Sequence, residues 1–136
     1  KLKLVFQERQ SPKEYWSMQL LSDLFAQGYD RIMVEVQDEE SLTCTPNDNC
    51  HTEFLADMIE AICQVGELTI RATLDVEGTL LLSKIQDFEV LGNHSFLSTT
   101  PIKAKIIGNY KGIYQCQITV MTPKKQLVVK ATYATI

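Results

Sequence analysis

The alternation of apolar and polar residues in the last third of the chain constrains the fold more than any other feature. Apolar residues occupy every second position over 102–106, 114–120 and 127–133. Turn-forming sequences at 108–112 and 122–125 separate these runs. A period of two between turns is typical of half-buried strands joined as antiparallel hairpins. The sequence therefore predicts a C-terminal antiparallel meander. It also marks 127–136 as a late strand whose free edge a partner strand could extend.

Two helices are predicted earlier in the chain. The first begins at Ser11-Pro12, where an N-cap serine, a proline at the first helical position and Glu14 as a capping-box partner coincide. It ends at Gly28. The second carries apolar residues at helical spacing over 54–62 and ends at Gly66. Short strands are expected at 2–6, 31–36 and 41–45.

The period changes after Gly66. Apolar residues alternate over 68–76, which favours a further strand, and Glu77-Gly78 is a suitable turn into the leucines at 80–82. The alternation slips near Ser83-Lys84, where a β-bulge or a strand break would account for the change.

The element order predicts an α+β domain, with two helices packed on one face of a mostly antiparallel, curved sheet. Residues 2–76 resemble a ferredoxin-like βαββαβ unit, which the C-terminal hairpins would extend. The alternative is a cone-shaped sheet with helices at its mouth, similar to nuclear transport factor 2-like or cystatin-like domains.

Length and composition predict a single domain over 1–136, with 45% hydrophobic and 22% charged residues. The chain opens on lysine instead of methionine, which suggests a domain cut from a longer protein. It has 13 basic residues against 17 acidic ones, which argues against nucleic-acid binding. No apolar run is long enough for membrane insertion.

The four cysteines bear on the cellular compartment. Cys44 and Cys50 enclose five turn-forming residues, so a local disulfide is expected there. Cys63 lies at the edge of the second helix's apolar stripe and Cys116 has inward parity, so these two could pair across the layers. Two disulfides would place the protein outside the cytoplasm, in the periplasm or secreted. The alternative is that Cys63 and Cys116 are small buried thiols.

Two further uses of these thiols stay open. Cys44, Cys50, His51 and Cys63 could form a tetrahedral zinc set, although their spacing matches no usual zinc signature. Cys50 could be a nucleophile if the start of the second helix lowered its pKa. The favoured expectation is no metal and no cofactor.

Other functional candidates are few, and no catalytic motif is present. Asp57 and Glu60 lie on the polar face of the second helix. Tyr110 and Lys111 at one turn, with Lys124 and Lys125 at another, are candidate contacts to a protein partner. Asn93 begins a glycosylation sequon, Asn-His-Ser, in a predicted loop.

The leading expectation is a non-enzymatic protein-binding or assembly module, an extracytoplasmic part of a larger envelope or surface complex. It would bind a protein partner or associate with itself through a sheet edge. The first alternative is a small-ligand-binding or enzymatic cone domain with a pocket between helices and sheet. The second is an intracellular regulatory domain with free or zinc-bound thiols.

Overall fold

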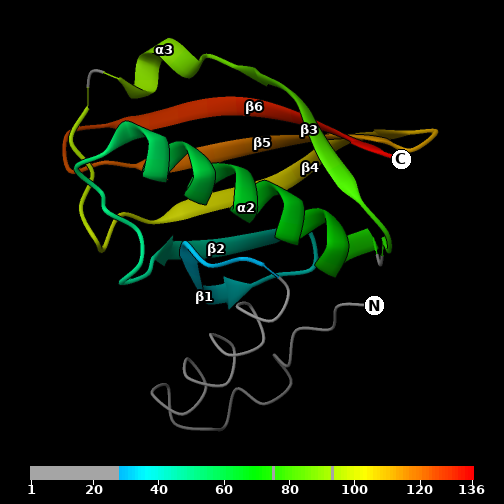
Figure 1. The fold of residues 1–136 in the computed structure, drawn as a ribbon, viewed down its shortest axis with the longest axis horizontal. Coiled ribbons are helices and arrows are strands. Elements are labelled where there is room, and N and C mark those ends of the chain that lie inside the picture. The colour runs from blue at the N-terminus through cyan, green and yellow to red at the C-terminus, as the bar shows by residue number, and fades with distance from the viewer. Residues whose placement is uncertain (1–27, 75, 93) are drawn as a thin grey trace, which may run out of the picture.

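A six-stranded antiparallel sheet with one long helix on one face forms the body of the protein (Figure 1). The structure is a computed structural model that describes residues 28–74, 76–92 and 94–136. The predicted strand at 2–6 and the helix beginning at Ser11 lie outside these residues. The strands are β1 (Ile32–Gln37), β2 (Ser41–Pro46), β3 (Leu80–Gln86), β4 (Ile102–Tyr110), β5 (Ile113–Met121) and β6 (Gln126–Thr135). The helices are α2 (Leu55–Leu74) and the single turn α3 (Phe88–Leu91).

The predicted C-terminal meander is confirmed. β4, β5 and β6 are consecutive neighbours in the strand order β1-β2-β4-β5-β6-β3. Ile118 on β5 pairs with Ala104 on β4 and with Val129 on β6, and all three side chains are fully buried. Directly paired residues share one face of a sheet, so these positions form the floor of the core.

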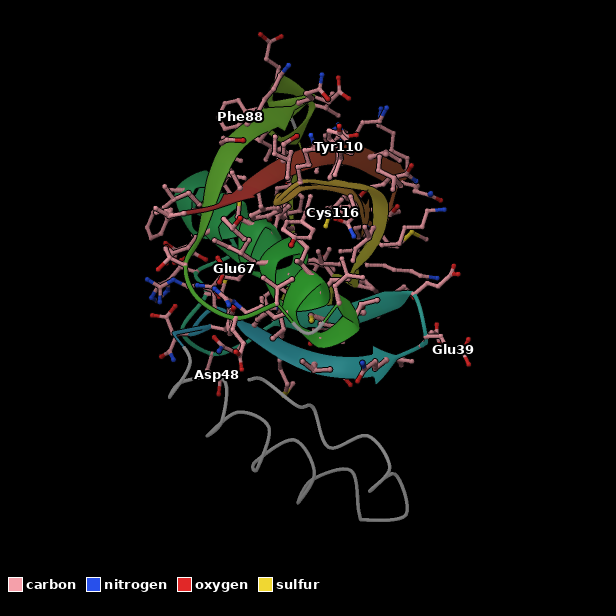
Figure 2. All side chains as sticks on the ribbon, turned by 90° about the vertical axis from the view of Figure 1, so that its right-hand side faces the viewer. Glu39, Asp48, Glu67, Phe88, Tyr110 and Cys116 are labelled. Atoms are coloured by element: carbon pink, nitrogen blue, oxygen red, sulfur yellow. The ribbon has the colours of Figure 1, made fainter. Side chains whose placement is uncertain are left out.

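The sheet curves around α2, which lies in its hollow (Figure 2). The helix packs mainly over β2, β4 and β5. Its buried side chains include Met58, Ile62, Val65, Leu68 and Ile70. The predicted α+β class and the antiparallel sheet are therefore confirmed. No helix in the described residues is long and apolar enough to cross a membrane.

The prediction that the second helix ends at Gly66 is wrong, because α2 continues for two more turns to Leu74. Residues 68–74 of the expected strand over 68–76 belong to this helix, so the ferredoxin-like arrangement is wrong. Leu68, Thr69 and Ile70 are consecutive and all buried. A helix enclosed on most sides loses the single apolar stripe of an amphipathic helix, so its sequence resembles an alternating strand.

The pairing of β3 with β6 confirms the predicted irregularity near Ser83-Lys84 and contradicts the predicted free edge at 127–136. The register with β6 shifts between Leu82 and Lys84, at the position where the alternation slips. β6 itself lies between β5 and β3, so the expectation that 127–136 offers a free edge is wrong. The two edges of the sheet in the described residues are β1 and β3.

The four cysteines are free thiols, so both predicted disulfides are wrong. Cys44 faces the core from β2 and is fully buried, whereas Cys50 lies in the next loop with its Sγ 3.9 Å from Met58 Sδ. Cys116 directs its Sγ to the carbonyl oxygen of Gly66 at 3.6 Å. Each thiol is a small hydrophobic group in the core or at its margin. The cysteines therefore give no support to an extracytoplasmic location, which stays a prediction.

Candidate functional site

A row of polar side chains follows one face of α2. Its members are Asp57, Glu60, Gln64, Glu67 and Arg71. Spacings of three and four residues place them one above another on the helix surface. The sequence indicated the polar character of Asp57 and Glu60, but the structure shows that the row continues over most of the helix. We refer to these five residues as the polar row.

The segment 29–31, which precedes β1, hydrogen-bonds to the C-terminal part of the polar row, at Gln64 and Glu67. The Arg31 backbone N–H donates to Gln64 Oε1 at 2.9 Å, and Gln64 Nε2 donates to Asp30 Oδ1 at 3.0 Å. The Tyr29 hydroxyl donates to Glu67 Oε2 at 2.5 Å. These bonds tie the entry of the edge strand to the central helix.

Glu67, labelled in Figure 2, accepts a second hydrogen bond from Arg71 Nε at 3.2 Å. Burial raises the pKa of Tyr29 far above its usual value, and the neighbouring Glu67 raises that pKa further. Tyr29 therefore stays protonated and acts as a permanent donor. Tyr29, Glu67 and Arg71 are therefore linked to one another by hydrogen bonds. Because these polar groups have partners within the protein, we assign them a structural role.

Glu60 differs from Glu67 because more of its carboxylate side chain is open to solvent. Its side chain is 49% exposed, and its Oε2 lies 3.6 Å from Arg31 Nε. That Nε atom is buried and has no hydrogen-bond partner among the described residues. Glu60 is thus an accessible carboxylate held beside a guanidinium that is incompletely paired.

The first turn of α2, which precedes Glu60 on the same helix, leaves backbone N–H groups without a partner inside the helix. The Met58 N–H bonds to the Phe54 carbonyl oxygen at 3.2 Å, so Phe54 occupies the N-cap position. Its side chain has no oxygen with which to cap the helix. The N–H groups of Leu55 and Ala56 consequently have no partner within the helix, and they lie at its partly positive end.

The loop before the helix is held in place on both sides. Asp57 Oδ2 accepts a hydrogen bond from the His51 backbone N–H at 2.9 Å. Asn47 Nδ2 donates to the carbonyl oxygens of Asp30 and Ile32, at 2.9 and 3.3 Å. Asp57 and Asn47 therefore fix the loop against the helix and β1, leaving Glu60 as the accessible carboxylate of the first two turns.

Helix geometry brings the Glu60 side chain toward the N–H groups of the first turn. Glu60 is four positions after Ala56, which corresponds to a rise of about 6 Å along the helix axis. Long helical side chains lean back toward the N-terminus, so the Glu60 carboxylate reaches over the first turn. A carboxylate can activate water, and helical N–H groups can stabilise a developing oxyanion. This pair suits attack on the carbonyl of an ester or thioester.

Cys50 is not an activated nucleophile. Burial raises its pKa to about 11, and the nearby Asp57 contributes to the rise. The alternative that the helix start lowers the pKa of Cys50 is therefore wrong, and the thiol is protonated at neutral pH. The described residues contain no group of three or more His, Cys, Asp or Glu that could hold a metal ion. Cys44, Cys50, His51 and Cys63 thus do not assemble as a zinc site.

The predicted partner contacts do not form one surface. Tyr110 and Lys111 lie at the turn between β4 and β5, and the Lys111 Nζ sits 5.3 Å from the centre of the Tyr110 ring. Lys124 and Lys125 lie at the turn between β5 and β6, at the other end of β5. Asn93, the predicted glycosylation position, lies outside the described residues.

Comparison with protein-family models gives no match, and neither does comparison with the sequences of curated proteins. Solved structures do match. A mutant of the thioesterase PA1618 from Pseudomonas aeruginosa has a TM-score of 0.60 at 17% identity, covering 93% of this chain and 95% of that chain. The thioesterase HI1161 from Haemophilus influenzae has a TM-score of 0.62 at 17% identity, covering 87% and 88%. A hypothetical thioesterase from Streptococcus pneumoniae, solved with coenzyme A, has a TM-score of 0.60 at 11% identity, covering 85% and 96%.

These matches identify the architecture as a hotdog fold, a long central helix wrapped by an antiparallel sheet. Three of the structures that share the fold are named thioesterases, and they contradict our leading expectation of a non-enzymatic assembly module. The alternative expectation of a small-ligand-binding or enzymatic domain agrees better with them.

Proposed function

We propose that this protein is a thioesterase that hydrolyses acyl thioesters of coenzyme A. The observation that carries the proposal is the solvent-open Glu60 carboxylate beside the uncapped start of the central helix, in a fold shared with thioesterases. The substrate class is suggested by the Streptococcus pneumoniae protein, which was solved with coenzyme A.

In the proposed reaction, the thioester carbonyl oxygen is held by the free N–H groups of Leu55 and Ala56. Glu60 takes a proton from a water molecule as that water attacks the carbonyl carbon. The new carbon–oxygen bond forms, the carbon–sulfur bond breaks, and the electron pair leaves with sulfur. The products are a carboxylate, the free thiol of coenzyme A and one proton. No redox partner is needed.

Arg31 and Asp57 have supporting roles in this scheme. The Arg31 guanidinium fixes the position of Glu60 from the side of β1, 3.6 Å away. Asp57 is committed to the His51 backbone N–H, so its carboxylate shapes the loop. We therefore assign the proton transfer to Glu60.

The test is hydrolysis of a panel of acyl-coenzyme A substrates of increasing acyl length, followed by the loss of thioester absorbance. This signal does not depend on the protein's own thiols. The corresponding oxygen esters are the control, because a thiolate leaves more readily than an alkoxide. We expect turnover of at least one thioester in proportion to protein concentration. Absence of turnover across the whole panel would refute the proposed function.

A further inference from the structure

The last third of the chain carries positive charge only. Residues 90–136 contain no aspartate, glutamate or arginine, and their charged residues are Lys103, Lys105, Lys111, Lys124, Lys125 and Lys130. Since the whole chain has a formal charge of −4, this segment contributes +6 and residues 1–89 contribute −10. A separation of charge along the sequence matters for binding only if the fold gathers one sign on one surface.

The fold gathers lysines on the outer face of the sheet, which is the face turned away from α2. Lys105 on β4 pairs with Gln117 on β5, and Gln117 pairs with Lys130 on β6. Ile118, the next residue of β5, is fully buried on the helix side, so Gln117 and its two partners face outward. Two strand spacings, about 10 Å, separate Lys105 from Lys130. Lys103 lies two positions before Lys105 and faces the same way.

Carboxylates do not neutralise these lysines. Lys103, Lys105 and Lys130 are exposed, and none of them forms an ion pair with another described residue. Lysine is the only charged residue type in strands β2 to β6. By contrast, Arg31 and Arg71 each lie beside a carboxylate of α2. The outer face therefore carries a positive field that is open to another molecule.

Exposed apolar side chains lie between the lysines. Met121 on β5 and Val128 on β6 are 45% and 37% exposed. Val128 pairs with Thr119, which in turn pairs with Lys103, so these side chains share the outer face. A groove of about 390 Å³ beside Lys103 and Met121 is lined further by the hydroxyl and amide groups of Thr43, Gln117, Thr119 and Gln126. The outer face thus combines cationic, hydrogen-bonding and apolar groups.

We propose that the outer face of β4, β5 and β6 docks on a membrane surface that contains anionic phospholipid, without any segment crossing the bilayer. Lys111 and Lys124 lie at the turns on either side of β5, a strand of nine residues that extends about 30 Å. This spread is too large for one small anion, whereas an extended anionic surface meets both ends. Lysine attracts anionic headgroups as a point charge, and the arginine preferred for nucleic-acid recognition is absent from residues 90–136.

The shape of the sheet agrees with docking on this side. The sheet curves around α2, so its outer face is convex and meets a flat surface first along its middle strands (Figure 2). β4 and β5 are the middle strands and β6 is next to them. The acidic turn 38–40 shares a hollow with Lys103 and Lys105, so the positive field weakens toward β2. Met121 and Val128 would enter the headgroup region and add an apolar contribution to the electrostatic attraction. Glu60, on the opposite side of the sheet, would stay open to substrate.

The test is co-sedimentation of the purified protein with two kinds of vesicle, phosphatidylcholine alone and an equal mixture of phosphatidylcholine and phosphatidylglycerol, at low ionic strength. We expect binding to the anionic vesicles only, and its loss in about 1 M salt, where the screening length falls to about 3 Å. Lys105→Gln combined with Lys130→Gln should lower the partition coefficient by roughly 30-fold, because two lysines at the centre of the contact are lost. Met121→Gln should lower it by roughly fivefold, because an apolar contact of similar size is lost.

Asn49→Asp combined with Thr79→Asp is the matched control. It changes the net charge by the same amount, at exposed positions in the loop before α2 and the turn before β3. This control should change the partition coefficient by less than about threefold, because both positions lie away from the contact. Circular dichroism and melting temperature establish that each variant is folded.

Four results would overturn the proposal: no binding to either kind of vesicle, equal binding to both kinds, equal losses in the lysine variant and the control, or binding to duplex DNA or polyglutamate without binding to anionic vesicles. The last result would instead indicate a soluble polyanion as the partner. No hydrolysis is measured, so the outcome is independent of the proposed thioesterase activity.

Discussion

The hydroxyl of Tyr133 occupies the space that a side chain at Gly66 would need. Tyr133 Oη donates to the carbonyl oxygen of Cys63 at 2.6 Å, one turn before Gly66 on α2. A Cβ added at Gly66 would overlap the Tyr133 hydroxyl and lie 3.1 Å from Ile118 Cδ1. The glycine therefore sets how closely the central helix approaches β5 and β6, and it explains a glycine within a helix.

Gly66→Ala should destabilise the protein. Overpacking of a core costs about 1–3 kcal/mol, and alanine regains about 1 kcal/mol of helix propensity. Because a hydrogen bond holds the Tyr133 ring, we expect a net loss of about 1–2 kcal/mol in the free energy of unfolding, measured by urea denaturation. Gly92→Ala is the control: Gly92 has φ of −68° and its nearest atoms lie 3.7 Å from an added Cβ. That variant should change stability by less than about 0.5 kcal/mol.

The same contact predicts a coupling between two substitutions. Tyr133→Phe removes the hydroxyl and should cost about 1 kcal/mol, since the Cys63 carbonyl keeps its helical partner. Gly66→Ala should then cost less in the Tyr133→Phe background than in the unaltered protein, because the most crowded atom is gone. Relief will be partial, since the ring carbon Cζ lies 3.0 Å from an added Cβ. If the two losses in the free energy of unfolding are strictly additive in this double-mutant cycle, the contact between Gly66 and Tyr133 is not supported.

Four thiols should be found by alkylation after denaturation without reductant. The count follows from the free state of all four cysteines. In the native protein alkylation should be slow, because burial raises the pKa of Cys63 to about 11 and that of Cys116 to about 12. Mass spectrometry reads both results. Recovery of only two thiols before reduction would show that two of the cysteines form a disulfide, contrary to the structure.

Stability should fall at alkaline pH. The thiols ionise near pH 9.0 when exposed, whereas burial raises the pKa of folded Cys116 to about 12. A group with a raised folded pKa contributes stability that is intact below its unfolded pKa and lost as pH rises toward the folded value. The melting temperature should therefore decline as pH increases above 9.0 toward 12. Cys116→Ala, although less stable at neutral pH, should show a shallower decline.

The sequence predicted the parts of the fold in which one face meets solvent and the other meets the core. β4, β5 and β6 satisfy that condition, and their alternation located them correctly. The second half of α2 does not satisfy it. Leu68 and Ile70 are buried on different sides of an enclosed helix, so their spacing carries no helical signature.

The site was harder to predict because its parts are distant in the sequence. Glu60 was recognisable as a polar helix position, but its ion-pair partner Arg31 lies before β1 and has no motif. The disulfide predictions were wrong for a related reason. Cys44 and Cys50 are close in sequence, yet Cys44 faces inward from β2 while the Cys50 Sγ contacts Met58. Only the packing of the whole domain separates a buried thiol from a disulfide.

The most direct test of the central claim is the hydrolysis of the best acyl-coenzyme A substrate by Glu60→Gln, compared with Glu53→Gln as the matched control. Glu53 is a 65% exposed glutamate that lies just before α2 and outside the polar row. Loss of a general base typically lowers the rate by about 10²–10⁴-fold. We therefore expect kcat to fall by at least about 100-fold in Glu60→Gln, with an unchanged melting temperature, and to stay within about twofold in Glu53→Gln. Equal activity in the two variants would contradict the assignment of Glu60 as the catalytic carboxylate.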